Sequence, residues 1–215
     1  MQRLSSWETP AHRLPRKKVG EAEVVTEFYE PGPYELYHVP DPDGEEHALY
    51  EAVERLPITV LKVGGKTVMV DDPPHWWMMK KHAEYYSGRV RVAGLGLGLI
   101  LHALDAEEHV EDIVVVERSQ DVVDLVLPSL DELDTPIEVV VMDWHDFPDV
   151  TEARERDFDG VFFDLFVGDG PSLVGMAMRE MIWMTERFPE AKTRRIHGMN
   201  NDFLEALSRG LGRMF

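Results

Sequence analysis

Four apolar runs, separated by segments that favour helix, constrain the fold of this chain more than any other feature. The runs cover residues 90–94, 112–117, 137–142 and 159–165. They recur about every 23 residues, which is the spacing of βαβ units in a parallel sheet. Within them β-branched residues dominate and polar residues are scarce, as in strands buried on both faces. The intervening helices are predicted at 97–105, 119–128, 147–154 and 173–188, with a fifth strand at 193–198 and a last helix at 200–211.

The N-terminal part of the chain has a different pattern. Residues 1–20 are polar and predict an arm. Residues 21–72 predict a small antiparallel β region with two hairpins, one joining 22–29 to 34–39 through Pro31-Gly32-Pro33, the other joining 58–63 to 66–70 through Gly64-Gly65. A helix over 75–86 follows Asp71 and Asp72, which can cap it. We therefore predict an α/β chain in which residues 73–215 form a Rossmann-like, mostly parallel sheet with helices on both faces, shortened at its C-terminal part.

Composition narrows the class of protein. The 215 residues carry 41 acidic and 22 basic side chains, a net charge of −19, so general binding to nucleic acid is not expected. There are no cysteines, which removes disulfides and thiolate chemistry and fits a reducing compartment. The apolar runs are shorter than the roughly 20 residues of a membrane span, and the N-terminus lacks the apolar core of a signal peptide. We expect a cytoplasmic protein without membrane contact.

A glycine-rich turn follows the first strand of the predicted sheet. Gly94, Gly96 and Gly98 alternate with leucines between an apolar run and a helix-forming run. Glycine permits positive φ and close approach of the backbone to a ligand. A strand, tight turn and helix in this order also directs backbone N–H groups toward a bound polar or anionic group. The turn is therefore the first candidate for a binding site.

Carboxylates follow the next three predicted strands. Glu117, Asp143 and Asp164 come at or just after their ends, and parallel strands place such residues at one edge of the sheet. Glu117, at the end of the second strand, could accept both hydroxyls of a ribose. Asp143 could accept a hydrogen bond from an exocyclic amine such as that of adenine, and Trp144 could either stack on the base or fill space beneath the loop. Asp164 could act as a base or orient a nucleophile. Together they predict a pocket for a nucleoside.

Two other readings of these residues were weighed. Dinucleotide binding requires G-x-G-x-x-G, whereas this turn reads G-x-G-x-G with Leu99 at the third glycine position, so NAD binding is the less favoured reading. His145 and Asp146 lie near the predicted pocket, but no ligand spacing supports a metal site. Asp169 fits better as a loop and cap residue than as part of the pocket.

The motifs resemble those of class I S-adenosylmethionine-dependent methyltransferases, and within them the spermidine-synthase-like branch. The resemblance covers roughly residues 57–170 and rests on four segments: 92–98, 114–117, 141–143 and 158–164. It implies a cofactor site for S-adenosylmethionine in which Gly94, Gly96 and Gly98 line the methionine part, Glu117 holds the ribose and Asp143 lies beside the adenine. Leu95, Arg118 and Trp144 are expected at the same cofactor site. It also implies that Asp164 faces the reacting centre.

The chain departs from that branch at two places. Pro74-His75-Trp76-Trp77 stands where spermidine synthases carry a Tyr-His-Glu type signature, and Asp164 lacks their following Asp-Pro step. Carboxylates that would grip a polyamine are therefore not evident, which favours methyl transfer to a small-molecule acceptor. Aminopropyl transfer, or a non-catalytic binding module built on the same fold, are the alternatives. The shortened sheet leaves an edge that a second copy of the chain could cover in a homodimer.

Overall fold

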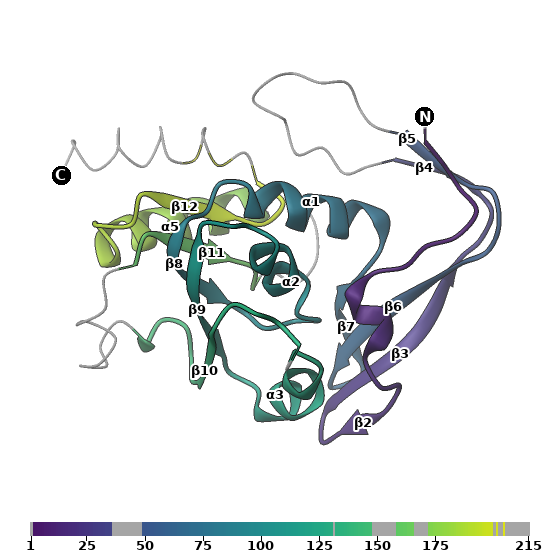
Figure 1. Cartoon of the computed structure of the whole chain (residues 1–215), viewed down its shortest axis with the longest axis horizontal. Helices are drawn as coiled ribbons and strands as arrows, with labels where there is room; N and C mark the ends of the chain where they lie inside the picture. Colours follow the sequence, from purple (N-terminus) through teal and green to yellow (C-terminus); the bar gives the residue numbers. More distant parts are fainter. Residues whose placement is uncertain are drawn as a thin grey trace.

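A five-stranded parallel sheet forms the centre of the larger part of the molecule (Figure 1). The computed structural model describes residues 2–35, 49–130, 132–147, 158–165, 172–199, 201 and 204. In spatial order the strands are β10 (Ile137–Val141), β9 (Val110–Glu117), β8 (Gly88–Ala93), β11 (Gly160–Phe163) and β12 (Thr193–Ile196). The predicted Rossmann-like sheet, including its fifth strand, is confirmed. After the central strand β8, the chain adds β9 and β10 on one side of it and then β11 and β12 on the other side. The strand order therefore reverses at β8.

Helices cover both faces of this sheet, as predicted. Helices α1 (Pro73–Ala83), α2 (Leu99–Asp105) and α3 (Gln120–Val126), the last continued by the 3₁₀ turn η2 (Leu127–Ser129), pack on one face, and α5 (Ser172–Arg187) packs on the other. Alternate residues of a strand point to opposite faces, so Val115 joins the first core and Val114 and Val116 the second. Most of the helices predicted at 147–154 and 200–211, and Asp169, lie outside the described residues. None of the described helices is long and apolar enough to span a membrane.

The second predicted hairpin is confirmed within a four-stranded antiparallel sheet. This sheet has the order β2 (Lys18–Val19), β3 (Ala22–Tyr29), β6 (Leu56–Val63) and β7 (Lys66–Val70). Gly64 and Gly65 join β6 to β7 with φ of 58° and 76°. Two consecutive positive φ values define a type I′ turn, whose twist matches that of the flanking strands and which glycine adopts without strain.

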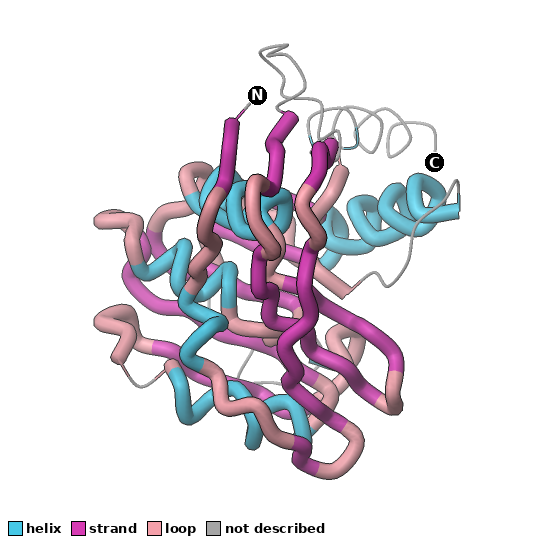
Figure 2. Tube along the Cα trace, turned by 90° about the vertical axis from the view of Figure 1, so that its right-hand side faces the viewer, coloured by secondary structure: helices cyan, strands magenta, loops and turns pink. Residues whose placement is uncertain are grey.

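The first predicted hairpin is wrong in its strand pairing. Strand β3 pairs with β6, whereas β4 (Gly32–Glu35) pairs with β5 (Leu49–Ala52) in a separate three-stranded sheet completed by β1 (Gln2–Leu4). Pro31-Gly32-Pro33 does not reverse the chain, because Gly32 has an extended φ of 159° and itself begins β4. The chain therefore runs on from β3 into the next sheet, and the partner strands return after residue 48 (Figure 2).

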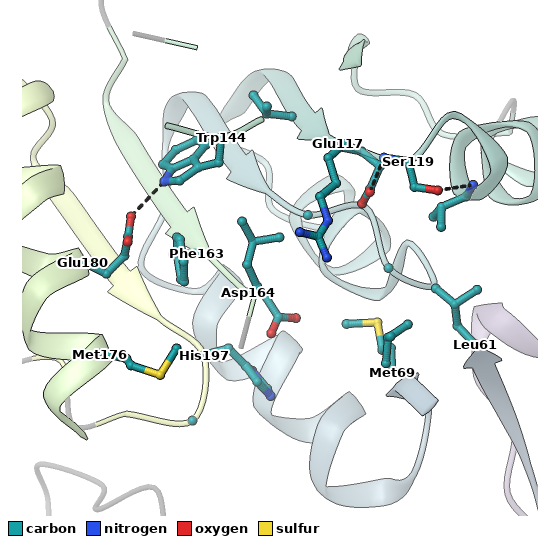
Figure 3. A pocket seen from close by; sticks show the side chains of 18 of the residues that line it. Leu61, Met69, Glu117, Ser119, Trp144, Phe163, Asp164, Met176, Glu180 and His197 are labelled. Atoms are coloured by element: carbon teal, nitrogen blue, oxygen red, sulfur yellow. Dashed lines mark hydrogen bonds between the residues drawn. The ribbon is translucent and has the colours of Figure 1, made fainter. Parts of the chain in front are cut away.

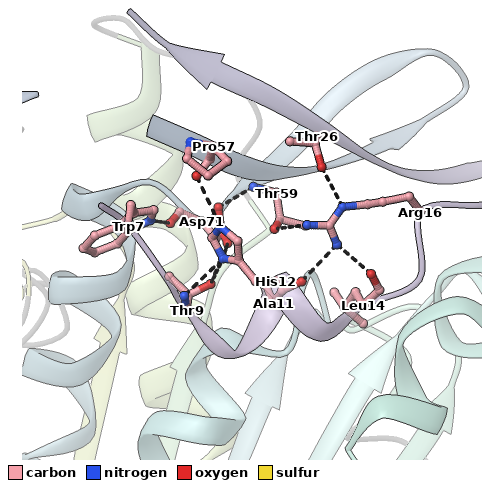
Figure 4. A network of polar contacts seen from close by, with 10 residues as sticks. All are labelled: Trp7, Thr9, Ala11, His12, Leu14, Arg16, Thr26, Pro57, Thr59 and Asp71. Atoms are coloured by element: carbon pink, nitrogen blue, oxygen red, sulfur yellow. Dashed lines mark hydrogen bonds and ion pairs between the residues drawn. The ribbon is translucent and has the colours of Figure 1, made fainter. Parts of the chain in front are cut away.

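The predicted polar arm packs against the rest of the molecule. Its 3₁₀ turn η1 (Pro10–Arg13) and the following residue bury Ala11 and Leu14 in the same core as α2 and β8. Asp71, at the end of β7, holds the arm in place: its carboxylate accepts hydrogen bonds from Thr9 Oγ1 and from the amide of Thr59, both at 2.5 Å (Figure 4). His12 Nδ1 lies 3.0 Å from the same carboxylate. The N-terminal strands thus share one core with the parallel sheet.

Candidate functional site

A cavity of about 1120 Å³ lies at the carboxyl ends of the parallel strands (Figure 3). Its walls come from residues that follow β8, β9, β10, β11 and β12, together with residues of β7, α1 and α5. This edge of the sheet, next to the strand at which the order reverses, is where open α/β sheets bind ligands. The volume is at the upper end of that of pockets for small molecules, which run to about 1,000 Å³.

Glu117 ties two turns together at the cavity wall. Its Oε2 accepts a hydrogen bond from the amide of Leu95 at 3.0 Å, and its Oε1 accepts one from the amide of Ser119 at 2.8 Å. The residue is buried and yet lines the cavity. Each carboxylate oxygen has a second lone pair. Glu117 is therefore a fixed acceptor that can receive a pair of hydroxyl groups from the cavity side.

The glycine turn forms part of the cavity wall, but two of its backbone N–H groups are already engaged within the protein. Gly94 and Gly96 line the cavity with φ of 95° and 51°. The amide of Leu95 is engaged by Glu117, and the amide of Leu97 points at the sulfur of Met69, 3.1 Å away on β7. These two N–H groups are not free to bind a phosphate, which weighs further against a dinucleotide.

The third glycine has a different place. Gly98 is the N-cap of α2 with φ of 76°, and it is not among the residues that line the cavity. A side-chain carbon there would come within 2.9 Å of Leu130, so glycine is needed for the close packing of α2 against the segment after α3. Leu95 is likewise buried, and its backbone rather than its side chain contributes to the site.

Asp143, Trp144 and Arg118 all line the cavity. Asp143 keeps a half-exposed carboxylate, whose Oδ1 accepts the amide of His145 at 2.9 Å. Trp144 is buried, and its indole N–H donates to Glu180 Oε1 at 2.9 Å. The indole is thus held in the wall by α5, and only its cavity-facing part can contact a base.

His145 completes a polar group at this end of the cavity. Its Nε2 lies 3.1 Å from Glu180 Oε2 and its Nδ1 3.4 Å from Asp143 Oδ1. In the part of the chain that the structure describes, no group of three or more His, Cys, Asp or Glu side chains is arranged to hold a metal ion.

Asp164 follows β11 and lies in the middle of the cavity wall (Figure 3). Its Oδ2 is buried, with no hydrogen-bond partner among the described residues. Burial raises the pKa of this carboxyl to about 6, and the nearby His75 opposes the rise. An unpaired carboxyl oxygen in a cavity wall can accept a hydrogen bond from a ligand or bind its cationic group.

Two histidines line the cavity that were not among the site residues expected from the sequence. His75, in the first turn of α1, and His197, after β12, both line the cavity, and their rings stack with centroids 5.0 Å apart. They are 122 positions apart in the chain, 197 against 75. A signal existed for each: His75 stands three residues after the helix cap Asp72, and His197 lies near the end of the fifth predicted strand, at the same edge as the carboxylates.

Comparison with known proteins shows no family for this chain. No family model and no curated protein matches the chain. Among solved structures it is similar to spermidine synthase from Thermotoga maritima (13% identity, TM-score 0.47, covering 86% of this chain and 72% of that one). It is also similar to spermidine synthase in complex with the transition state analogue AdoDATO (16% identity, TM-score 0.40, covering 66% of this chain and 56% of that one). A third similar structure is a protein-L-isoaspartate O-methyltransferase (16% identity, TM-score 0.33, covering 68% of this chain and 38% of that one).

The chain thus spans only 56% and 38% of the second and third of these structures. All three likenesses are weak in sequence and in the course of the backbone. The functional proposal therefore has to rest on the residues of the cavity.

Proposed function

We propose that the cavity binds S-adenosylmethionine and that the protein transfers the methyl group to a small-molecule acceptor. The observation that carries the proposal is the position of Glu117: a buried carboxylate at the end of the strand next to the glycine turn, held by two amides and open to the cavity. This is the placement in which an acid receives both hydroxyls of a ribose. Asp143, after the neighbouring strand, then lies where an adenine amine could donate to it.

The remaining residues fit the rest of such a ligand. Gly94 and Gly96 place no side chain on the wall between Glu117 and Asp164, where the methionine part would lie. Asp164, with its unpaired Oδ2, faces the region between this wall and the histidines. When bound, S-adenosylmethionine supplies an activated methyl group, so the protein has mainly to orient the two reactants and exclude water. The cavity is large enough to hold an acceptor beside the cofactor.

Two alternatives keep the same pocket. Aminopropyl transfer from decarboxylated cofactor would require carboxylates for a polyamine. Of the acids that line the cavity, Glu117 binds amides and Glu180 binds Trp144 and His145, which leaves Asp143 and Asp164 for that task. A binding module without catalysis would hold the nucleoside and turn nothing over. Cytoplasmic location and a homodimer remain predictions from the sequence.

Calorimetric titration separates these readings at the first step. We expect S-adenosylmethionine and S-adenosylhomocysteine to bind with dissociation constants in the micromolar range and NAD not to bind. The bound protein is then incubated with methyl-labelled cofactor and a small-molecule cell extract, and separately with decarboxylated cofactor and putrescine. Label in the extract supports methyl transfer, an aminopropylated product supports the first alternative, and binding without either supports the module. No binding at millimolar cofactor would overturn the proposal.

A further inference from the structure

His75 has the surroundings of a general base. It lies in the first turn of α1 and lines the cavity, with 28% of its side chain exposed. Its Nδ1 lies 3.0 Å from Oδ1 of Asp72, the residue that caps the helix. A neutral imidazole whose Nδ1–H donates a hydrogen bond to a carboxylate carries its lone pair on the other ring nitrogen, Nε2.

Asp72 is itself fixed in place. It is buried, and its Oδ1 also accepts the amide of His75 at 3.0 Å, which fixes the start of the helix. Its Oδ2 accepts the hydroxyl of Tyr29 from β3 at 2.5 Å. Hydrogen bonds from two elements thus hold the carboxylate that orients the imidazole. A base oriented by a third, buried group is the arrangement that proton-transfer sites use.

His75 also lies close to residues of the parallel sheet that line the same cavity. The ring of His197 stacks on it from β12, at 5.0 Å between centroids and an interplanar angle of 27°. Asp164, at the end of β11, is close enough to act on its charge. The imidazole is therefore held at Nδ1 by Asp72 and on one face by His197, and it lines the same cavity as Asp164.

We propose that His75, oriented by Asp72, is the general base that removes the proton from the methyl acceptor. This inference rests on the proposed function and adds the acceptor's chemical class: a neutral hydroxyl or an amine, whose nucleophilic atom carries a proton that must leave.

The step balances as follows. The acceptor oxygen or nitrogen uses a lone pair to form the new bond to the methyl carbon, and the carbon–sulfur bond breaks with its electron pair remaining on sulfur. The acceptor's proton passes to Nε2 of His75. The imidazolium so formed is stabilised by Asp72, and it loses its proton to water when the products leave.

The charges around His75 set the pH at which it can act. Burial opposes protonation of the imidazole, but the hydrogen bond with Asp72 and the charges of Asp72, Asp164 and Asp71 outweigh it and raise the pKa of His75 above 6.5. His197 is neutral, because burial lowers its pKa to about 3. The free base therefore accumulates as pH rises past this raised pKa, and methyl transfer should rise with it.

His75→Asn tests the proposal with little change in packing. Asparagine places its amide N–H near the position of Nδ1, so the contact with Asp72 can be kept, but it has no basic nitrogen at Nε2. We expect S-adenosylhomocysteine to bind this variant within twofold of the unmodified protein. Transfer of labelled methyl into the small-molecule extract should fall about 100-fold or more, which is the usual contribution of a general base. The pH-dependent rise should vanish, and imidazole should partly restore transfer in His75→Ala. His109→Asn, at an exposed histidine, is the matched control.

Nitrogen NMR of the complex with S-adenosylhomocysteine gives a readout that needs no acceptor. The His75 signals, assigned by their loss in His75→Asn, should show the Nδ1–H tautomer above the pKa. An Nε2–H tautomer would overturn the proposal, and so would unchanged transfer or an unchanged pH profile in His75→Asn. Loss of S-adenosylhomocysteine binding in that variant would assign His75 a structural role instead. If the unmodified protein binds no S-adenosylhomocysteine, the proposed function fails, and this inference fails with it.

Discussion

The carboxylate of Glu117 accepts the amide of Leu95 at 3.0 Å, which joins the end of β9 to the glycine turn that follows β8. The same carboxylate accepts the amide of Ser119 at 2.8 Å, at the start of α3. One side chain thus fixes the two turns that meet at the centre of the sheet edge. The geometry of the proposed cofactor site depends on this contact before any ligand arrives.

Glu117→Gln should weaken S-adenosylmethionine binding strongly. Glutamine has one acceptor oxygen where glutamate has two, so one amide loses its acceptor and the ribose faces an N–H instead of a charged oxygen. Hydrogen bonds to charged groups are worth about 1.5–3 kcal/mol, so the dissociation constant should rise about 10- to 100-fold. Calorimetry measures it, with Glu111→Gln, an exposed acid on the same strand, as the control. Equal affinities in the two variants would contradict the placement of the ribose.

Gly94→Ala should destabilise the fold, because two constraints meet at that residue. Its φ of 95° is unfavourable for any L side chain, and an added carbon would lie 2.9 Å from the carbonyl oxygen of Asp164. We expect a loss of about 2–4 kcal/mol in the free energy of unfolding. Gly175→Ala, in α5 with open space around it, should instead stabilise the protein by up to about 1 kcal/mol. Urea unfolding of both variants checks the contrast, and similar values would refute it.

The fold was predictable where local pattern and burial agree. The apolar runs such as Val114–Val116 are buried on both faces, and the Gly64-Gly65 pair could only make a tight hairpin turn. The pairing of β3 was not predictable, because Pro31-Gly32-Pro33 suits both a turn and an extended bend. What decides between them is the long-range partner β6, and that contact has no local signature.

The site was predictable to the extent that it lies at strand ends. Glu117, Asp143 and Asp164 reach the same cavity because parallel strands end at one edge. The surroundings of these residues were not predictable: the charge of His75, from another element, acts on Asp164, and the Trp144 indole donates to Glu180 of α5. Such contacts depend on how helices pack on the sheet, which residue spacing along one strand does not encode.

Trp144→Phe should show that this side chain is mainly part of the cavity wall. Phenylalanine keeps an aromatic ring but removes the N–H that donates to Glu180, leaving a buried carboxylate with one donor fewer. The expected cost is about 1–3 kcal/mol of stability, measured by thermal unfolding. S-adenosylmethionine affinity should change less than about threefold. A large loss of affinity without loss of stability would instead favour stacking of the indole on the base.

His12→Gln should lower stability in a pH-dependent way. The hydrogen bond with Asp71 is the main reason that the pKa of His12 lies above its ordinary value of 6.5, with burial opposing and the charge of Asp71 adding to the rise. A raised pKa in the folded state means that the stabilisation is fully present below about pH 6.5 and is lost as pH rises through the folded-state value. The difference in unfolding free energy between protein and variant should therefore be larger at pH 5.5 than at pH 9. A difference that grows with pH would contradict the contact shown in Figure 4.

Asp164→Asn and Asp159→Asn should have opposite effects, although the two residues stand at the two ends of β11. Burial raises the pKa of Asp164 to about 6, so ionisation of this carboxyl disfavours the folded state. Asp164→Asn should be about as stable as the unmodified protein below pH 3.8 and more stable by about 2–3 kcal/mol above pH 6. The hydrogen bond from Lys192, followed by that from the amide of Arg89, lowers the pKa of Asp159. Its contribution is present above the unfolded-state pKa and is lost as pH falls.

Urea unfolding of both variants at several pH values between 3 and 8 checks these signs. A stabilised Asp164→Asn that still binds S-adenosylmethionine but no longer transfers methyl would show that the protein keeps an unfavourable buried carboxyl for the sake of its reaction. A destabilised Asp164→Asn would instead mean that the carboxyl supports the fold, and the role of Asp164 at the reacting centre would then have to be given up. The Asp159→Asn variant is the control for a general effect on stability of removing one negative charge from a chain with a net charge of −19.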